Sequence, residues 1–307
     1  MTAKERYRKL CETEGEHIPL FLQYWWMETV CTGKKWDVIL AEDSFGNIIG
    51  AMPYLIGSKL GMRYIIQPQL TQYNGPWLKY PEKANECKRL YFEKKVFSNF
   101  IEQLKELKLI YFQQNFSPLI TNWLPFYWKG YRQTTRYTYR IEDIQDTLKV
   151  WNGFDHHSRQ KKIAKAAESL QTDHSLTPEE FADFHIAYWK SRGSKDLVPR
   201  DLIIRLINTA TQRNQGLLLG LRTRDGILQG ARFVAYDSNC GYALLSALNP
   251  DGHDNGCSPL LFWEIIQRLA ARTKSFDFEG SMDENIEQSY RLYGAVQTPY
   301  MKIWKWL

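Results

Sequence analysis

The chain contains the same order of predicted elements twice. Each copy consists of two strands joined by a short turn, a third strand, a long helix and a closing strand. The first copy covers residues 36–43, 48–57, 62–68, 85–108 and 109–115, and the second covers 216–223, 227–237, 241–248, 258–273 and 275–280. The second strand of each hairpin carries the pattern G-x-x-x-G-A, in GNIIGA (46–51) and GILQGA (226–231). The repeated order predicts an internal duplication.

Three further helices are predicted ahead of the second copy, at residues 156–170, 177–193 and 199–213. The middle one has a clear N-terminal signal, because Thr177 can act as its cap and Pro178 suits its first position. Helices and strands in this order predict a mixed α/β fold. We expect two domains, covering residues 1–145 and 146–307.

The composition indicates a globular protein with a mild positive charge. Lys and Arg number 40 against 34 Asp and Glu, a formal charge of +6. This suits anionic partners such as nucleotides or RNA, but is weaker than a nucleic-acid-binding signature. The five cysteines have no C-x-x-C spacing, so no zinc site or disulfide framework is predicted. Without a secretory signal or an apolar run of about 18 residues, we expect a cytoplasmic protein with no membrane span and no bound metal.

The segment NPDGHDNGCSPLLFWEII (249–266) joins a predicted strand to a helix. Ser258 and Pro259 match the cap and the first position of that helix. Gly252 and Gly256 allow a tight turn with exposed backbone N–H groups, and such a turn at a helix N-terminus suits a pyrophosphate. The alternative is a capped helix after a flexible turn, which the two aspartates of the loop favour.

The stretch FDFEG (276–280) alternates aromatic and acidic side chains. In a strand, Phe276 and Phe278 point to one face, while Asp277 and Glu279 point to the other. Two carboxylates side by side can accept a proton from an amine nucleophile. A structural pairing with nearby basic side chains explains them equally well.

A short helix is predicted after this strand. Ser281 and Glu284 form a capping box, and Gly294 can end the helix in a left-handed conformation. Glu287 and Arg291 have the spacing of an i, i+4 ion pair. One face of the helix carries three residues at i, i+4 and i+7 spacing, namely Ile286, Tyr290 and Tyr293.

The helix at 156–170 is basic, with cations at Arg159, Lys161, Lys162 and Lys165. Such a helix can hold a phosphate-bearing substrate or the acceptor end of a tRNA, although a solvated helix face explains it as well. Cys257 lies at a predicted helix N-terminus, which is expected to lower the pKa of its thiol. Since the sequence places no histidine beside it, we interpret Cys257 as a packing residue.

Taken together, several stretches resemble the GNAT acyltransferase superfamily, and in particular its duplicated Fem-like branch. That branch contains peptidyltransferases that add amino acids to cell-wall precursors, and uncharacterised acetyltransferase-like proteins. The resemblance covers nearly the whole chain. It rests on Trp25, Trp26, Trp36, GNIIGAMPYLIG (46–57) and QYNGPWL (72–78) in the first half, and on SRQKKIAKA (158–166), NGCSPLLFWEIIQRLA (255–270), FDFEGS (276–281) and YRLYGA (290–295) in the second.

This resemblance implies two tandem GNAT domains, each a mixed, mostly antiparallel sheet flanked by helices. In GNAT enzymes the fourth and fifth strands splay apart, and the acyl donor lies between them with its pyrophosphate on the following helix. Those strands would be 241–248 and 275–280 here. The implied donor-binding residues are Asn255, Gly256, Cys257 and Ser258. The first domain is expected to supply scaffold and a wall of the acceptor site.

For the reaction centre, the resemblance points to Asp277 or Glu279 as the proton acceptor. Arg291 stands where Fem-type transferases commonly have a lysine, and it would stabilise an oxyanion. Substrate-binding residues are expected among Arg159, Lys162, Tyr290 and Tyr293. The chain is therefore predicted to be an N-acyltransferase that moves an acetyl or aminoacyl group to a small-molecule or peptidic amine.

Two donors stay open at this point, acetyl-CoA (or another acyl-CoA) and aminoacyl-tRNA. Donor-binding GNAT loops usually read Gln/Arg-x-x-Gly-x-Gly/Ala, whereas this loop reads HDNGCS (253–258). This departure from the family pattern counts against coenzyme A as the donor. An aminoacyl-tRNA donor would imply a peptidyltransferase acting on a cell-wall precursor. The alternative class is a non-catalytic binding protein that has kept the fold.

Overall fold

The computed structural model describes residues 1–249, 255–280, 282 and 284–307. They form two compact units: unit 1 is Met1–Arg136 with Pro299–Leu307, and unit 2 is Tyr137–Thr298. The division differs from the expected boundary at residue 145 in two ways: the chain enters unit 2 already at Tyr137, and the C-terminal segment Pro299–Leu307 returns to unit 1.

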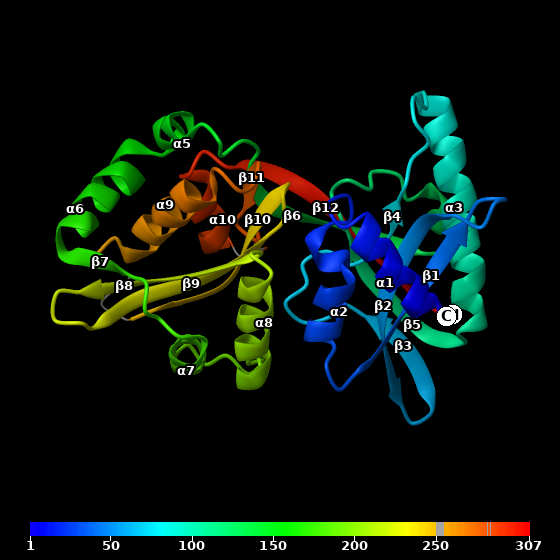
Figure 1. Ribbon diagram of the computed structural model, residues 1–307, viewed down its shortest axis with the longest axis horizontal. Helices are drawn as coiled ribbons and strands as arrows, with labels where there is room; N and C mark the ends of the chain where they lie inside the picture. Colours follow the sequence, from blue (N-terminus) through cyan, green and yellow to red (C-terminus); the bar gives the residue numbers. More distant parts are fainter. Residues whose placement is uncertain (250–254, 281, 283) are drawn as a thin grey trace. The chain divides into compact units, whose positions relative to one another are not determined.

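Unit 1 contains a sheet in the order β1-β2-β3-β5-β12, with the short strand β4 paired to β2 (Figure 1). These strands are β1 (Lys35–Glu42), β2 (Ile48–Lys59), β3 (Met62–Ile66), β4 (Trp77–Leu78), β5 (Leu109–Phe116) and β12 (Val296–Trp306), the last beginning in unit 2. The helices are α1 (Ala3–Thr13), α2 (Tyr24–Val30), α3 (Glu86–Glu106) and α4 (Leu124–Tyr127), with a 3-10 turn η1 (Leu20–Leu22).

Unit 2 contains a sheet in the order β6-β11-β10-β9-β8-β7. Its strands are β6 (Arg132–Ile141, beginning in unit 1), β7 (Leu170–Asp173), β8 (Gly216–Thr223), β9 (Leu228–Tyr236), β10 (Cys240–Leu248) and β11 (Ser275–Asp277). Its helices are α5 (Thr147–Gly153), η2 (His156–Gln160), α6 (Lys161–Ser169), α7 (Pro178–Ser191), α8 (Arg200–Gln212), α9 (Cys257–Leu269) and α10 (Glu284–Arg291). Helices α6 and α9 lie on one side of β8 and β9, and α7 lies on the other (Figure 1).

The predicted duplication is confirmed by the order and pairing of the strands. In unit 1, β1 pairs with β2 and β2 with β3 in antiparallel fashion, and after α3 the strand β5 joins β3 in parallel. In unit 2, β8, β9 and β10 pair in the same antiparallel way, and after α9 the strand β11 joins β10 in parallel.

Local signals also hold at several boundaries. Helix α7 begins directly after Thr177, whose hydroxyl accepts the Glu180 N–H at 3.1 Å as the capping pattern predicts. The basic helix begins as expected at residue 156, but its first turn, η2, is a π-helix. The strand predicted at 275–280 ends at Asp277, and this difference shapes the candidate site.

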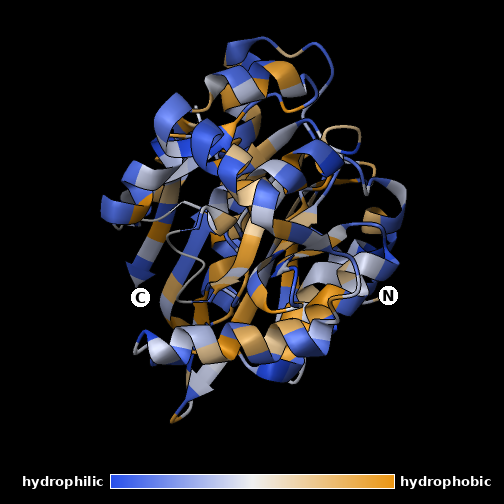
Figure 2. Cartoon of the chain, turned by 90° about the vertical axis from the view of Figure 1, so that its left-hand side faces the viewer, coloured by the Kyte–Doolittle hydropathy of each residue, from blue (hydrophilic) through white to orange (hydrophobic). Residues whose placement is uncertain are grey.

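Each unit has its own apolar core. Phe97, Phe100 and Phe112 are fully buried in unit 1, and Leu261 and Phe276 are fully buried in unit 2. Burial of each such side chain contributes roughly 1.5–3 kcal/mol. Figure 2 shows the pattern behind this, with long hydrophobic stretches along central strands and alternating hydrophobic and hydrophilic stretches along the helices.

Candidate active site

Strand β10 is paired with β11 only over its first three residues. The parallel register joins Cys240–Tyr242 to Ser275–Asp277, while β10 continues to Leu248. Strand β11 also pairs with β6 on its other side, and beyond Asp277 the chain continues along β6, since the Phe278 N–H donates to the Tyr139 carbonyl at 2.9 Å. The register of β10 against β9 also shifts between Tyr242 and Leu245, as at a β-bulge. The two strands therefore diverge in the way the GNAT resemblance implies.

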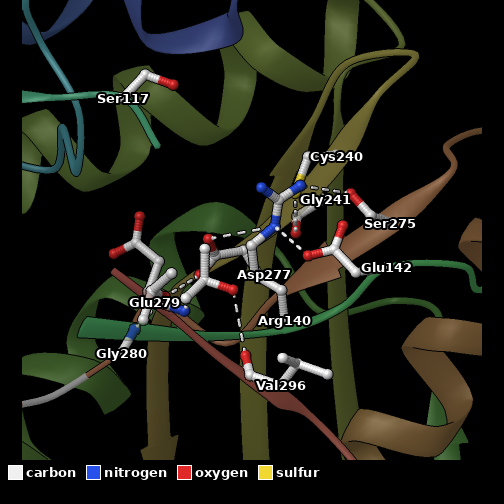
Figure 3. Close-up of polar contacts among 12 residues, drawn as sticks. Ser117, Arg140, Glu142, Cys240, Gly241, Ser275, Asp277, Glu279, Gly280 and Val296 are labelled. Atoms are coloured by element: carbon white, nitrogen blue, oxygen red, sulfur yellow. Dashed lines mark hydrogen bonds and ion pairs between the residues drawn. The ribbon is translucent and has the colours of Figure 1, made fainter. Parts of the chain in front are cut away.

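Asp277 is fully buried and held by protein groups on several sides. Its Oδ1 accepts hydrogen bonds from the Thr138 hydroxyl and, at 2.8 Å, from the Glu279 N–H. Its Oδ2 lies 4.0 Å from the Arg140 Nε, and Arg140 also donates to the Ser275 hydroxyl at 2.9 Å (Figure 3). These contacts fix the turn that follows β11.

Glu279 does not share a strand face with Asp277, because the strand has already ended. Its backbone has φ +55°, a left-handed conformation that is uncommon for a residue with a side chain. In Figure 3 its carboxyl lies on the far side of Asp277 from Arg140. The prediction of two adjacent carboxylates on one strand face is therefore wrong, and the turn separates them.

Glu279 as a residue is half-buried, but one of its carboxyl oxygens is enclosed. Its Oε1 atom is buried and receives no hydrogen bond from the described residues. Burial raises the pKa of this carboxyl well above its usual range, and the negative charge of Asp277 adds to the rise. Backbone strain and an unsatisfied titratable group at one position are typical of functional sites.

Tyr290 of α10 and Tyr293, just after that helix, pack against aromatic rings of the unit 2 core. Tyr290 and Tyr293 each lie 5.1 Å from the Phe278 ring, and Tyr293 lies 5.0 Å from Phe262. Burial raises the pKa of Tyr290. The positive charge of Arg232 opposes this rise, and the negative charge of Glu279 adds to it. Tyr290 is thus within electrostatic range of both groups.

Arg232 of β9 is a site candidate that sequence analysis missed. It is 5% exposed and its guanidinium lies 3.7 Å from the centre of the Phe262 ring. Its Nε is buried without a hydrogen-bond partner, and no carboxylate of the described residues forms an ion pair with it. Burial lowers its pKa. The available signal was a single charge within the apolar run GARFVAY (230–236).

Arg159 has a structural environment that differs from its predicted substrate-binding role. It is buried, with one terminal nitrogen donating to the Ser289 carbonyl and hydroxyl at 2.8 Å and the other donating to the Ser158 carbonyl at 2.9 Å. Its guanidinium lies 4.3 Å from the Tyr293 ring. Arg159 therefore ties the basic segment to α10, and the exposed cations of that segment are Lys161, Lys162 and Lys165.

The N-terminus of α9 is already capped by its own loop. The cap is Gly256, with φ +81°, where Ser258 was predicted. The Asn255 side chain accepts the Cys257 N–H at 3.0 Å, and Pro259 has no N–H to offer. Among the first three helical residues, only the Ser258 N–H has no hydrogen bond to another described residue. Gly252 and the histidine and aspartates of the predicted loop, like the Ser281 cap, lie outside the described residues.

The four predicted donor-binding residues do lie together at this helix end, but packing limits them. A Cβ on Gly256 would lie 2.7 Å from the Lys162 carbonyl oxygen, so the loop is pressed against α6. Cys257 is buried, and burial raises the pKa of its thiol to about 12, opposite to the predicted lowering. Its interpretation as a packing residue agrees with this burial.

Arg291 lies on the exposed side of α10. It forms the predicted i, i+4 ion pair with Glu287 at 2.9 Å, and its side chain is 61% exposed. Glu287 also accepts a hydrogen bond from the Tyr139 hydroxyl at 2.6 Å. Arg291 thus belongs to a surface pair, and the structure does not bring it into contact with Asp277 or Glu279.

In unit 1, the strands that correspond to β10 and β11 are β3 and β5, and the loop after β3 forms hydrogen bonds with the end of β5. The Asn115 N–H donates to Gln67 at 2.9 Å, and its side chain donates to the Gln72 carbonyl at 3.1 Å. The Asn74 N–H donates back to the Asn115 carbonyl at 2.7 Å. This loop therefore provides hydrogen-bond partners for the backbone at the end of β5. Among the described residues, no corresponding loop does so for β11.

Within the described ranges, no group of three or more acidic, histidine or cysteine side chains has the geometry of a metal site. No helix in this part of the chain is long and apolar enough to cross a membrane.

Comparison with known proteins found similarities in sequence to part of the chain and in fold to nearly all of it. Residues 157–285 match the acetyltransferase (GNAT) domain, while no curated protein matches the sequence. The crystal structure of FemX aligns with a TM-score of 0.72 at 11% identity, over 98% of this chain and 96% of FemX. A tandem GNAT protein from the clavulanic acid biosynthesis pathway aligns with a TM-score of 0.55 at 10% identity, over 98% and 94% of the two chains.

The structure of L-PGS from Bacillus licheniformis also aligns, with a TM-score of 0.54 at 11% identity over 97% of this chain and 90% of that one. At these identities the structural likeness concerns the fold alone. Residues 157–285 thus match the model of a GNAT acetyltransferase domain, and the chain has, over nearly its whole length, the fold of FemX and of tandem GNAT proteins.

Proposed function

We propose that the protein is an N-acyltransferase whose reaction takes place where β10 and β11 diverge. The observation that carries this proposal is that the Glu279 Oε1 and the Arg232 Nε are both buried and have no hydrogen-bond partner among the described residues. Both are within electrostatic range of Tyr290. Burying an ionisable group without a hydrogen-bond partner destabilises the fold. A bound substrate that forms hydrogen bonds with both groups would offset this cost.

Arg232 is suited to an anionic group of the donor or of the transition state. A fixed guanidinium in a buried site interacts strongly with charge that develops on a carbonyl oxygen. It takes the role expected of Arg291, which is engaged at the surface by Glu287. Its stacking on Phe262 holds the guanidinium in one orientation.

Glu279 is suited to move the proton. The attacking amine forms a bond to the acyl carbon and passes its proton to the Glu279 carboxylate, which then gives that proton to the leaving sulfur or oxygen. Such a carboxyl works best when its pKa is raised toward the working pH, the direction that burial gives Glu279. Asp277 holds the turn that presents Glu279.

An aminoacyl-tRNA ester is the donor that the geometry favours. In the described part of the chain, the first three residues of α9 offer a single N–H, that of Ser258, which is little for the pyrophosphate of coenzyme A. The neighbouring helix α6 exposes Lys161, Lys162 and Lys165, which suit a nucleic-acid backbone. An acyl-CoA is the second candidate, because residues 157–285 match a family of acetyltransferases.

Acyl transfer from each donor to a panel of primary amines tests the proposal. Wild type is compared with Glu279→Gln, Arg232→Gln and the control Asp183→Asn, whose carboxylate is exposed and paired with Arg200. Both site variants are expected to lose at least about a hundredfold in rate, and the control to keep it. Transfer that is unaffected by both site variants refutes the proposed centre. A folded protein inert with every donor supports the non-catalytic alternative.

The donor is tested separately by titrating the protein with charged tRNA and with acetyl-CoA at two salt concentrations. The triple variant Lys161→Glu, Lys162→Glu, Lys165→Glu is expected to weaken tRNA binding and leave acetyl-CoA unaffected. Saturable acetyl-CoA binding without tRNA binding reverses the assignment of the donor.

A further inference from the structure

Unit 1 contains a cavity that the proposed reaction does not use. Its volume is about 510 Å³, which is in the range of small-molecule sites. The walls come from the segment between α1 and η1, from the chain that leads into α3 together with the first turn of α3, and from the residues after β5. Six of the side chains that decide its chemistry are His17, Trp77, Tyr80, Lys83, Arg89 and Leu119.

We propose that this cavity binds a small amphipathic anion, with an apolar body and a phosphate or carboxylate group. The site lies wholly within unit 1 and is independent of the acyl-transfer centre proposed above.

The charge of the walls selects an anion. Lys83 and Arg89 line the cavity, and no carboxylate does. Arg89 donates from its Nε to Glu93 at 3.2 Å and also interacts with the Tyr80 side chain. Its side chain is 40% exposed, so part of the guanidinium can be reached by a ligand.

A buried network beneath the cavity holds its polar wall in place. The Glu93 side chain is 3% exposed and accepts hydrogen bonds from the Tyr80 hydroxyl at 2.7 Å and from the Asn122 amide at 2.8 Å. The Arg89 guanidinium lies 4.8 Å from the centre of the Tyr80 ring. Because Glu93 joins a loop, a helix and the segment after β5, Tyr80 and Arg89 are fixed before any ligand arrives, which favours binding.

The apolar part of the wall indicates the body of the ligand. Trp77 is fixed by its indole N–H, which donates to the His17 carbonyl at 2.9 Å. Leu119 is 66% exposed at the edge of the cavity, a large apolar side chain left in water. A flat or branched apolar group would cover both, with its anionic end toward Arg89.

Calorimetric titration with 1-naphthyl phosphate, 1-naphthol and inorganic phosphate tests the proposal. We expect one molecule of 1-naphthyl phosphate per chain, bound at least about tenfold more tightly than either fragment alone, since a charge-assisted hydrogen bond is worth about that factor. Equal binding of 1-naphthol and 1-naphthyl phosphate would remove the anion from the proposal, and no binding would overturn it.

Variants locate the site. Leu119→Glu places a negative charge at an exposed position of the wall, and Arg89→Gln removes the cation; each is expected to weaken binding roughly tenfold or more. Lys94→Gln is the matched control, since this exposed lysine lies on the same helix outside the cavity. Unchanged affinity in both wall variants, with folding verified by circular dichroism, overturns the proposal. Glu279→Gln should leave this binding intact, so the two proposals can fail separately.

Discussion

Replacing Glu279 with glutamine should stabilise the protein at neutral pH while removing activity. At pH values below the usual glutamate pKa of 4.5, the carboxyl is protonated in both the folded and the unfolded chain. Above that pH the unfolded chain loses the proton, whereas the buried carboxyl retains it. The folded state then binds more protons than the unfolded state, so the free energy of unfolding falls as the pH rises.

The size of this effect follows from the linkage. Between pH 4.5 and the raised pKa of folded Glu279, wild type loses about 1.4 kcal/mol of stability per pH unit relative to a chain without this carboxyl. Above the raised pKa both states are ionised and the loss stays constant. Glutamine has nearly the same shape and does not titrate, so the Glu279→Gln variant escapes this loss.

Urea denaturation of wild type and Glu279→Gln at pH 5, 6, 7 and 8 measures the difference. The stability advantage of the variant should be small at pH 5 and grow with pH until it levels off. Asp183→Asn serves as the control, because its exposed pair with Arg200 is worth at most about 1 kcal/mol. An advantage that is independent of pH, or a variant that becomes less stable than wild type as the pH rises, would refute the reasoning.

Three further substitutions probe the same region by urea denaturation. Arg232→Met should raise the free energy of unfolding by about 1 kcal/mol or more, because it replaces a buried charge without a partner by an apolar chain; a large loss of stability would show that the guanidinium is paired. Asp277→Asn should lower it by about 3 kcal/mol, since Arg140 keeps its charge in a buried site; a change below about 1 kcal/mol would argue against a structural role. Gly256→Ala should lower it by about 1–3 kcal/mol, because the backbone has φ +81° and the new Cβ would lie 2.7 Å from the Lys162 carbonyl oxygen. A neutral result would mean that the loop can shift.

Much of the fold was predictable from local patterns. Strand β8 occupies the predicted residues 216–223, and the cap at Thr177 fixes the start of α7. These signals depend on neighbours in the sequence, which is why they transfer reliably to the structure.

The candidate site was less predictable because its geometry depends on contacts between distant residues. The alternation in FDFEG suggested a strand to residue 280, but β11 ends at Asp277, where the chain turns to Thr138 and Tyr139 of β6. No local pattern in the sequence predicts these contacts with β6. The division of the chain was displaced for the same reason, since β12 pairs with β5 almost 200 residues earlier.

The two arginines show a second limit of sequence reasoning. Arg291 was favoured because a Fem-type cation stands at its position, yet it is exposed and paired with Glu287. Arg232 attracted no attention because a charge within an apolar strand usually lies at a surface-facing position. Only the packing of Phe262 against its guanidinium shows that this charge is enclosed.

A carbon-13 NMR titration of the glutamate side-chain carboxyl carbons is the sharpest test of the reaction centre. The Glu279 resonance is assigned by its absence from the Glu279→Gln spectrum. If Glu279 is the enclosed, unpartnered proton carrier described above, its resonance will titrate well above the range of the other glutamates and will move when a donor binds. A Glu279 resonance that titrates near 4.5 with the exposed glutamates would contradict that role and leave the opening between β10 and β11 without a base.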